Sequence, residues 1–124
     1  MKKYRNKQFI RSEEDECITF AAYLELLVQQ KKIIAYTHVA NETYSRSWAA
    51  GKRRKAIGVK PGFPDYIILT KSWMLFIEMK RSVGGVISSE QKEWNIVLNQ
   101  YPDSLAAICK GFDEAKQFID FNIY

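Results

Sequence analysis

Residues 64–80 read PDYIILTKSWMLFIEMK and decide the fold, because two apolar runs flank a short polar turn. The runs 66–69 and 73–77 are rich in β-branched and aromatic residues, which favour strands. Lys71 and Ser72 fit a two-residue turn between the two runs. We therefore predict a β-hairpin in this stretch.

A two-residue turn also fixes which residues of the hairpin lie opposite each other. Thr70 then pairs with Trp73, and counting outward along both strands places Asp65 opposite Glu78. Because side chains alternate along a strand, Lys80 turns to the same face as Glu78. One face of the hairpin is thus predicted to carry two carboxylates and an amine.

This face has the composition of a metal site. Directly opposite residues have Cβ atoms about 4.5 to 5.5 Å apart, and two like charges at that distance raise each other's pKa unless a positive group lies between them. Carboxylate oxygens suit Mg²⁺ or Mn²⁺. A cation that polarises a phosphate and activates water, beside a lysine that offsets negative charge, suits phosphodiester hydrolysis. The alternative interpretation is a Glu78 and Lys80 surface pair at a strand end.

The rest of the chain predicts helices and strands around this hairpin. Ser12 and Ser88 are the expected N-caps of two helices. We expect helices over 12–28, 44–57, 88–101 and 113–121, and strands over 33–39, 66–69, 73–77 and 105–109. This order predicts an α/β fold, in which a mixed β-sheet is flanked by helices.

The composition describes one ordinary globular domain. The 124 residues are 47% hydrophobic and 27% charged, which is enough to build a core. We expect a basic N-terminal tail over 1–11 and a single domain over 12–124. Cys17 and Cys109 have no partners at zinc-ligand spacing and are expected to be reduced, buried thiols. No apolar run reaches the about 18 residues that span a bilayer, so we expect a cytoplasmic protein without a membrane partner.

Positive charge is concentrated in two segments of the first half of the chain. The net charge of +5 and the pI near 9.2 favour an anionic partner. One segment is the N-terminal tail; the other lies between Glu42 and Asp65 and contains no carboxylate. Its cations are Arg46, Lys52, Arg53, Arg54, Lys55 and Lys60. We expect this second segment to bind nucleic acid; the alternative is a solvated helix.

Five motifs, in this order, make the sequence similar to the VRR-NUC domain of the PD-(D/E)XK nuclease superfamily. They are Ser12-Glu13, HVANE at 38–42, GVKPGFPD at 58–65, IEMK at 77–80 and SSEQ at 88–91. The resemblance implies the restriction-endonuclease-like core of that superfamily, in the order αβαββαβα. Cys17 departs from the family, whose members often carry glutamine there, and implies a different packing or hydrogen bond at that helix turn.

The resemblance also implies a metal-dependent deoxyribonuclease and gives individual residues a role. Mg²⁺ or Mn²⁺ would be held by Asp65, Glu78, the Met79 backbone carbonyl and Glu13. Lys80 would act on the attacking water, and Gln91 would lie beside the lysine. Glu13 is singled out because it falls on the apolar stripe of the first helix, with Glu14 and Glu16 as alternatives. Contacts to DNA would come from Asn41, Arg46, Lys52, Arg53, Arg54, Lys55, Lys60, Arg81 and Ser88.

Stand-alone domains of this family resemble Holliday-junction resolvases and occur in phages. This implies a homodimer that cuts branched DNA with a symmetric pair of sites, in a bacterial host cell if the protein is phage-encoded. Trp48, Ile87 and Trp94 are candidates for the dimer surface. Tyr44 and Trp48 are expected to pack on the sheet rather than flank DNA, and His38 is expected to be structural. The alternatives are a catalytically silent DNA-binding module of the same fold and an interaction subunit with no nucleic-acid role.

Overall fold

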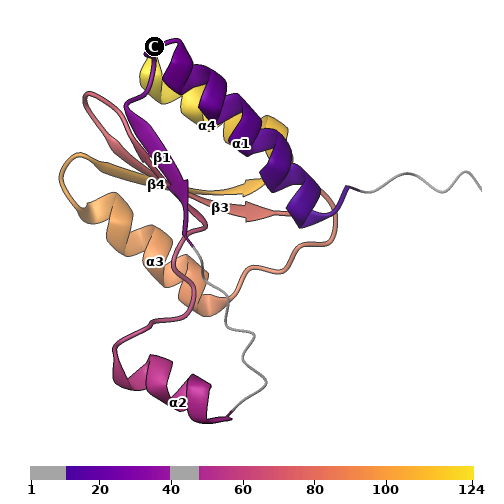
Figure 1. Ribbon diagram of the computed structural model, residues 1–124, viewed down its shortest axis with the longest axis vertical. Coiled ribbons are helices and arrows are strands. Elements are labelled where there is room, and N and C mark those ends of the chain that lie inside the picture. Colours follow the sequence, from indigo (N-terminus) through magenta and orange to yellow (C-terminus); the bar gives the residue numbers. More distant parts are fainter. Residues whose placement is uncertain (1–10, 40–47) are drawn as a thin grey trace, which may run out of the picture.

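The computed structural model describes residues 11–39 and 48–124 (Figure 1). Within these ranges the order of helices and strands is the order expected from the sequence. The elements are α1 (Glu13–Gln29), β1 (Ala35–His38), α2 (Trp48–Ala56), β2 (Tyr66–Leu69), β3 (Met74–Lys80), α3 (Ser89–Gln100), β4 (Ser104–Lys110) and α4 (Gly111–Ile123). The first strand is shorter than predicted, and the predicted start of the second helix, 44–47, lies outside the described residues. None of the helices in these ranges is both long and apolar enough to cross a membrane.

The described strands form one mixed sheet in the order β1-β2-β3-β4. Antiparallel pairing joins β1 to β2 and β2 to β3, whereas β3 and β4 are parallel. In the hairpin, Tyr66 lies opposite Ile77, and the Thr70 N–H donates to the Trp73 carbonyl at 2.9 Å. The predicted mixed sheet and the predicted hairpin register are therefore confirmed.

The core lies between the sheet and the pair of helices α1 and α4, which run side by side over one face (Figure 1). Phe20 and Leu24 of α1 are fully buried against Ile77 and Met79 of β3 and Ile119 of α4. Burying each such side chain stabilises the fold by about 1.5 to 3 kcal/mol. The side chains of Phe76, Glu78 and Lys80 alternate with these along β3 and therefore point to the opposite face of the sheet, where α3 lies.

Helix α3 is fixed to the opposite face at both of its ends. At its start, the Gln91 side-chain amide donates to Glu78 Oε1 of β3 at 2.8 Å, and Gln91 also forms a capping box with Ser88, whose hydroxyl accepts from the Gln91 N–H at 3.1 Å. Near its end, the Asn99 amide pairs with the N–H and the carbonyl of Ala106 at 2.8 and 2.9 Å. Asn99 thereby satisfies the Ala106 backbone on the outer edge of β4, beside which no further strand lies within the described residues.

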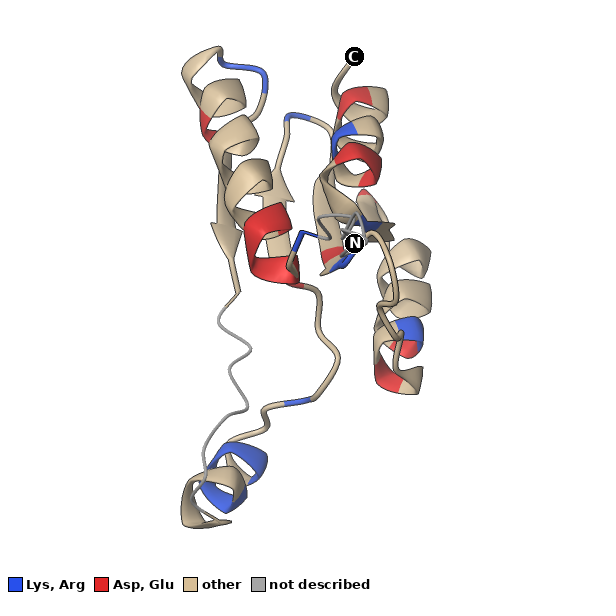
Figure 2. Cartoon of the chain, turned by 90° about the vertical axis from the view of Figure 1, so that its right-hand side faces the viewer, with Lys and Arg blue, Asp and Glu red and all other residues tan. Residues whose placement is uncertain are grey.

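Helix α2 stands apart from the other helices and from the sheet in both views (Figures 1 and 2). None of its residues is buried, and Trp48 is 80% exposed. The expectation that Trp48 packs on the sheet is therefore wrong, because the helix that carries it does not lie on the sheet. Tyr44 lies outside the described residues.

The segment 58–64, which leads from α2 to β2, is clamped onto α3. The Trp94 indole N–H donates to the Pro61 carbonyl at 3.0 Å. The Phe63 ring lies edge-on between Trp94 and Phe76, with centroid distances of 5.0 and 5.8 Å. This approach segment thus delivers the chain to Asp65 from a fixed position.

Gly62 provides a test of this clamp, because its φ is +85° and an added Cβ would lie 2.6 Å from the Glu90 carbonyl carbon. We expect Gly62→Ala to lower the free energy of unfolding by about 1 to 3 kcal/mol, measured by urea denaturation. Gly51→Ala is the matched control, since nothing lies within 4 Å of its added Cβ and alanine favours the helix. Equal stability of the Gly62 variant and the wild type would contradict the tight packing of the segment on α3.

Candidate active site

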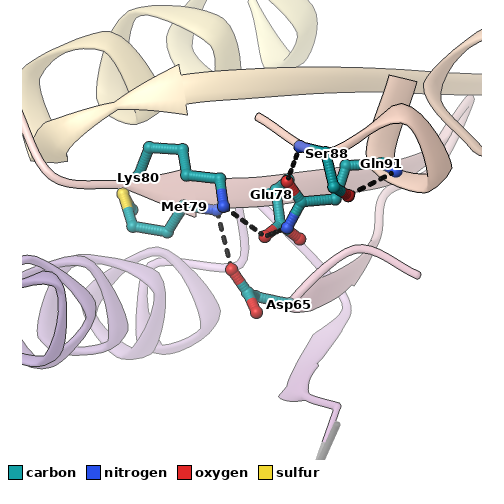
Figure 3. A network of polar contacts seen from close by, with 6 residues as sticks. All are labelled: Asp65, Glu78, Met79, Lys80, Ser88 and Gln91. Atoms are coloured by element: carbon teal, nitrogen blue, oxygen red, sulfur yellow. Dashed lines mark hydrogen bonds and ion pairs between the residues drawn. The ribbon is translucent and has the colours of Figure 1, made fainter. Parts of the chain in front are cut away.

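Asp65 and Glu78 meet where the hairpin approaches the start of α3 (Figure 3). Asp65 directly precedes β2, and the register of the hairpin continues to place it opposite Glu78 on β3. The Asp65 carboxylate accepts a hydrogen bond from the Met79 N–H at 2.8 Å. Glu78 is only 6% exposed. The hairpin therefore holds a half-buried carboxylate, Asp65, close to a buried one, Glu78.

Gln91 connects Glu78 to the first turn of α3. Its amide nitrogen donates to Glu78 Oε1 at 2.8 Å, while its amide oxygen accepts from the Ser88 N–H at 2.9 Å. Because both ends of the amide are engaged, its orientation is fixed and the Glu78 carboxylate is fixed with it (Figure 3). The Ser88 hydroxyl, predicted to contact DNA, serves in the capping box of the same turn.

Lys80 lies on the same face as Glu78. Its Nζ is 3.7 Å from Glu78 Oε1, and its side chain is 11% exposed. The amine is therefore an ion-pair neighbour of the carboxylate and not a hydrogen-bond donor to it at this distance. It is held within short reach of any group that binds between the two carboxylates.

The carboxylates at the start of α1 have different surroundings. Glu16 is buried and accepts from the Phe112 N–H at 2.6 Å, so its carboxylate ties α1 to the start of α4. Glu13 and Glu14 are exposed, and the charge of Glu13 contributes to raising the pKa of Glu78. Glu13 as a third ligand stays a prediction, because no three His, Cys, Asp or Glu side chains within 11–39 and 48–124 group closely enough to hold a metal.

The protein groups around the two carboxylates do not compensate for their burial. Burial raises the pKa of Glu78 to about 8, with the charge of Asp65 as the next cause, although Lys80 opposes the rise. Burial also raises the pKa of Asp65, opposed by the Met79 N–H and by the charge of His38. Adjacent carboxylate oxygens whose burial is not offset by the nearby charges of Lys80 and His38 fit a hard divalent cation. Asp65 and Glu78 are therefore the residues that would hold one.

The described DNA-contact residues predicted besides Ser88 lie on α2, on the approach segment and directly after β3. Lys52, Arg53, Arg54 and Lys55 lie on α2, and Figure 2 shows this concentration of basic residues. Lys60 is exposed on the approach segment, and Arg81 is exposed directly after β3, where its guanidinium donates to the Gly84 carbonyl at 3.3 Å. Asn41 and Arg46 lie outside the described residues.

Several residues that position the site were missed by sequence reasoning. Phe63 and Trp94 fix the approach segment, and nothing in their spacing indicated that they touch. The Tyr66 hydroxyl donates to the Cys17 carbonyl at 3.1 Å and so joins α1 to the hairpin. Cys17 is a free, half-buried thiol, and burial raises its pKa to about 11. Cys109 is free and buried, as expected.

The raised pKa of Glu78 predicts how the stability of the metal-free protein depends on pH. Between about 4.5 and about 8, the folded state keeps a proton that the unfolded state releases, so the free energy of unfolding falls as pH rises through this window. We expect Glu78→Gln to remove part of this decline in urea denaturation with EDTA. Glu93→Gln, at an exposed position of α3, is the control and should keep the wild-type decline. Equal pH dependence in all three proteins would show that Glu78 titrates normally.

Comparison with known proteins supports the fold. A solved structure described as a VRR_NUC domain protein matches with a TM-score of 0.59 and 20% sequence identity, over 90% of this chain and 88% of that chain. No protein-family profile matches the sequence, and no curated protein matches it. At this identity the likeness concerns the fold alone. The chain therefore has a VRR-NUC-like fold.

Proposed function

We propose that this protein is a metal-dependent DNA endonuclease that hydrolyses phosphodiester bonds. The observation that carries the proposal is the pair formed by the half-buried Asp65 and the buried Glu78, with Lys80 on the same face and Gln91 of α3 bonded to Glu78. These residue types, in this arrangement, suit phosphodiester hydrolysis without a histidine or cysteine nucleophile. The likeness to a VRR_NUC domain protein supports the same conclusion at the level of the fold.

The residues of the chain divide into ligands and groups that position them. Asp65 and Glu78 would hold Mg²⁺ or Mn²⁺, and we propose that the Met79 carbonyl and Glu13 complete the ligand set. When bound, the cation would polarise the scissile phosphate and activate water. The Met79 N–H orients Asp65, and Gln91 orients Glu78.

Lys80 is the charged donor nearest to the reacting phosphate in this proposal. Its amine is almost excluded from solvent, and a cation in such a position stabilises developing negative charge more than it would in water. It also has hydrogens with which to orient the attacking water. This role requires the charge of Lys80 and not only its length.

Phosphate contacts from the basic residues would hold the DNA. We propose that the α2 cations, Lys60, Arg81 and Ser88 contribute, together with Asn41 and Arg46 outside the described residues. Phosphate contacts give affinity without reading sequence, so selectivity would come from DNA structure. We propose branched DNA or Holliday junctions as substrates and a homodimer as the active form, as in a phage-type stand-alone enzyme of the cytoplasm.

Cleavage assays test the chemistry. Linear duplex, single-stranded, flapped and four-way-junction DNA are incubated with Mg²⁺, Mn²⁺ or EDTA. We expect metal-dependent cleavage of at least the branched substrates, and a loss of 100-fold or more in rate for Asp65→Ala and Lys80→Ala, on the order of the loss of a major electrostatic group. Lys71→Ala, on the exposed hairpin turn, removes the same charge as the Lys80 variant and should retain activity.

Two results would overturn the endonuclease proposal. No metal-dependent cleavage of any substrate would leave the catalytically silent DNA-binding module, and full activity of either site variant would refute the proposed site.

The salt dependence of binding tests the basic helix. If α2 contacts phosphates, the double variant Arg53→Ala/Lys55→Ala should reduce the slope of log K against log salt by about two, measured by filter binding in EDTA. The double variant Lys31→Ala/Lys32→Ala removes the same charge from exposed positions after α1 and should keep the wild-type slope. An unchanged slope in the α2 variant would favour a solvated helix.

A further inference from the structure

Trp48, Lys52 and Lys55 form one exposed face of α2, here called the arm face. Their spacing of four and seven residues places them on the same side of the helix. Trp48 is 80% exposed, and both lysines are exposed. Lys52 Nζ lies 4.7 Å from the centroid of the Trp48 ring. An exposed aromatic ring thus lies beside a positive charge.

Folding of the described chain does not explain this face. The ring is outside the hydrophobic core, and α2 stands apart from the packed helices (Figures 1 and 2). Tryptophan offers about 150 to 250 Å² of surface for burial and is enriched where proteins bind partners. The helix contains no carboxylate, so its charge is complementary to an anionic partner.

We propose that the arm face binds an unpaired nucleic-acid strand, with Trp48 stacked on a base and the two lysines on neighbouring phosphates. This inference rests on the proposed function in that nucleic acid is the partner. In a duplex the faces of the bases are covered by their neighbours, whereas a single strand can offer a base to an aromatic side chain. An exposed tryptophan beside lysines therefore suits a single strand better than a duplex, which needs only the cations.

The arm is also close to the carboxylate site along the chain. The five residues from the end of α2 to Pro61, which is held by Trp94, span at most about 18 Å. The favoured substrate is therefore DNA that carries, besides the cleaved phosphate, an unpaired segment within the reach of α2.

Tryptophan fluorescence tests the proposal directly. The full chain is titrated in EDTA with oligothymidine and with an abasic strand of equal length, which keeps the phosphates but has no bases. We expect saturable quenching by oligothymidine and little quenching by the abasic strand.

Variants test whether the quenching and the affinity for oligothymidine depend on the Trp48 ring. Trp48→Ala should weaken oligothymidine binding about 5- to 150-fold, as expected for loss of one stacked base, and leave binding of the abasic strand unchanged. Trp48→Phe should lose the quenching but keep most of the affinity. Phe121→Ala removes an aromatic side chain that is 85% exposed on α4 and should change neither property. Circular dichroism shows that each variant is folded.

Three results would overturn the proposal. They are equal affinity for both strands, normal oligothymidine binding by Trp48→Ala, and burial of Trp48 by a second copy of the chain. The last would appear as a concentration-dependent emission shift without DNA and as a dimer that Trp48→Ala dissociates in ultracentrifugation.

The experiments distinguish failure of the endonuclease proposal from failure of the arm-face proposal. Asp65→Ala should keep base-dependent quenching, because the variant leaves the arm face intact. Base-dependent quenching without cleavage by the wild type supports the arm face and overturns the endonuclease. Cleavage without base-dependent quenching supports the endonuclease and overturns the arm face.

Discussion

Two carboxylates held opposite each other on a short hairpin are the constraint around which this structure is organised. Burial disfavours the ionised state of a carboxylate, and it raises the pKa of both Asp65 and Glu78. The fold tolerates the pair because each carboxylate has one strong hydrogen-bond donor, the Met79 N–H for Asp65 and the Gln91 amide for Glu78. Among the described residues, the charges of Lys80 and His38 oppose the raised pKa values but do not offset them, which is the basis for the proposed cation and its chemistry.

The surrounding elements hold this arrangement in place from several directions. The start of α3 serves twice, since Gln91 closes the capping box with Ser88 and also orients Glu78. The approach segment is clamped by Trp94 and Phe63, so Asp65 enters the site from a fixed backbone. A site of this kind is preorganised, because its ligands are oriented before any substrate arrives.

The basic helix α2, in contrast, is not held by packing against the rest of the described chain. Its residues are not buried, and its exposed tryptophan and cations face solvent. In the proposed function, the site on the sheet and the exposed basic helix would separate two tasks, chemistry and the holding of an extended polyanion. The position of α2 apart from the sheet agrees with this division, because it keeps the basic residues of α2 from neutralising the two carboxylates.

Local features of the sequence determined the hairpin register, the two serine caps and the order of helices and strands, because turn length, strand period and capping depend on residues close together in the chain. Tertiary structure decided that Glu16 binds the start of α4, that Asn99 satisfies the edge of β4, and that Trp94 is used in packing while Trp48 is not. These outcomes depend on which surfaces meet after the sheet and helices assemble, and residues distant in sequence meet only through that packing. The sequence therefore placed the carboxylates and the lysine on one face, and the assembled fold supplied their surroundings.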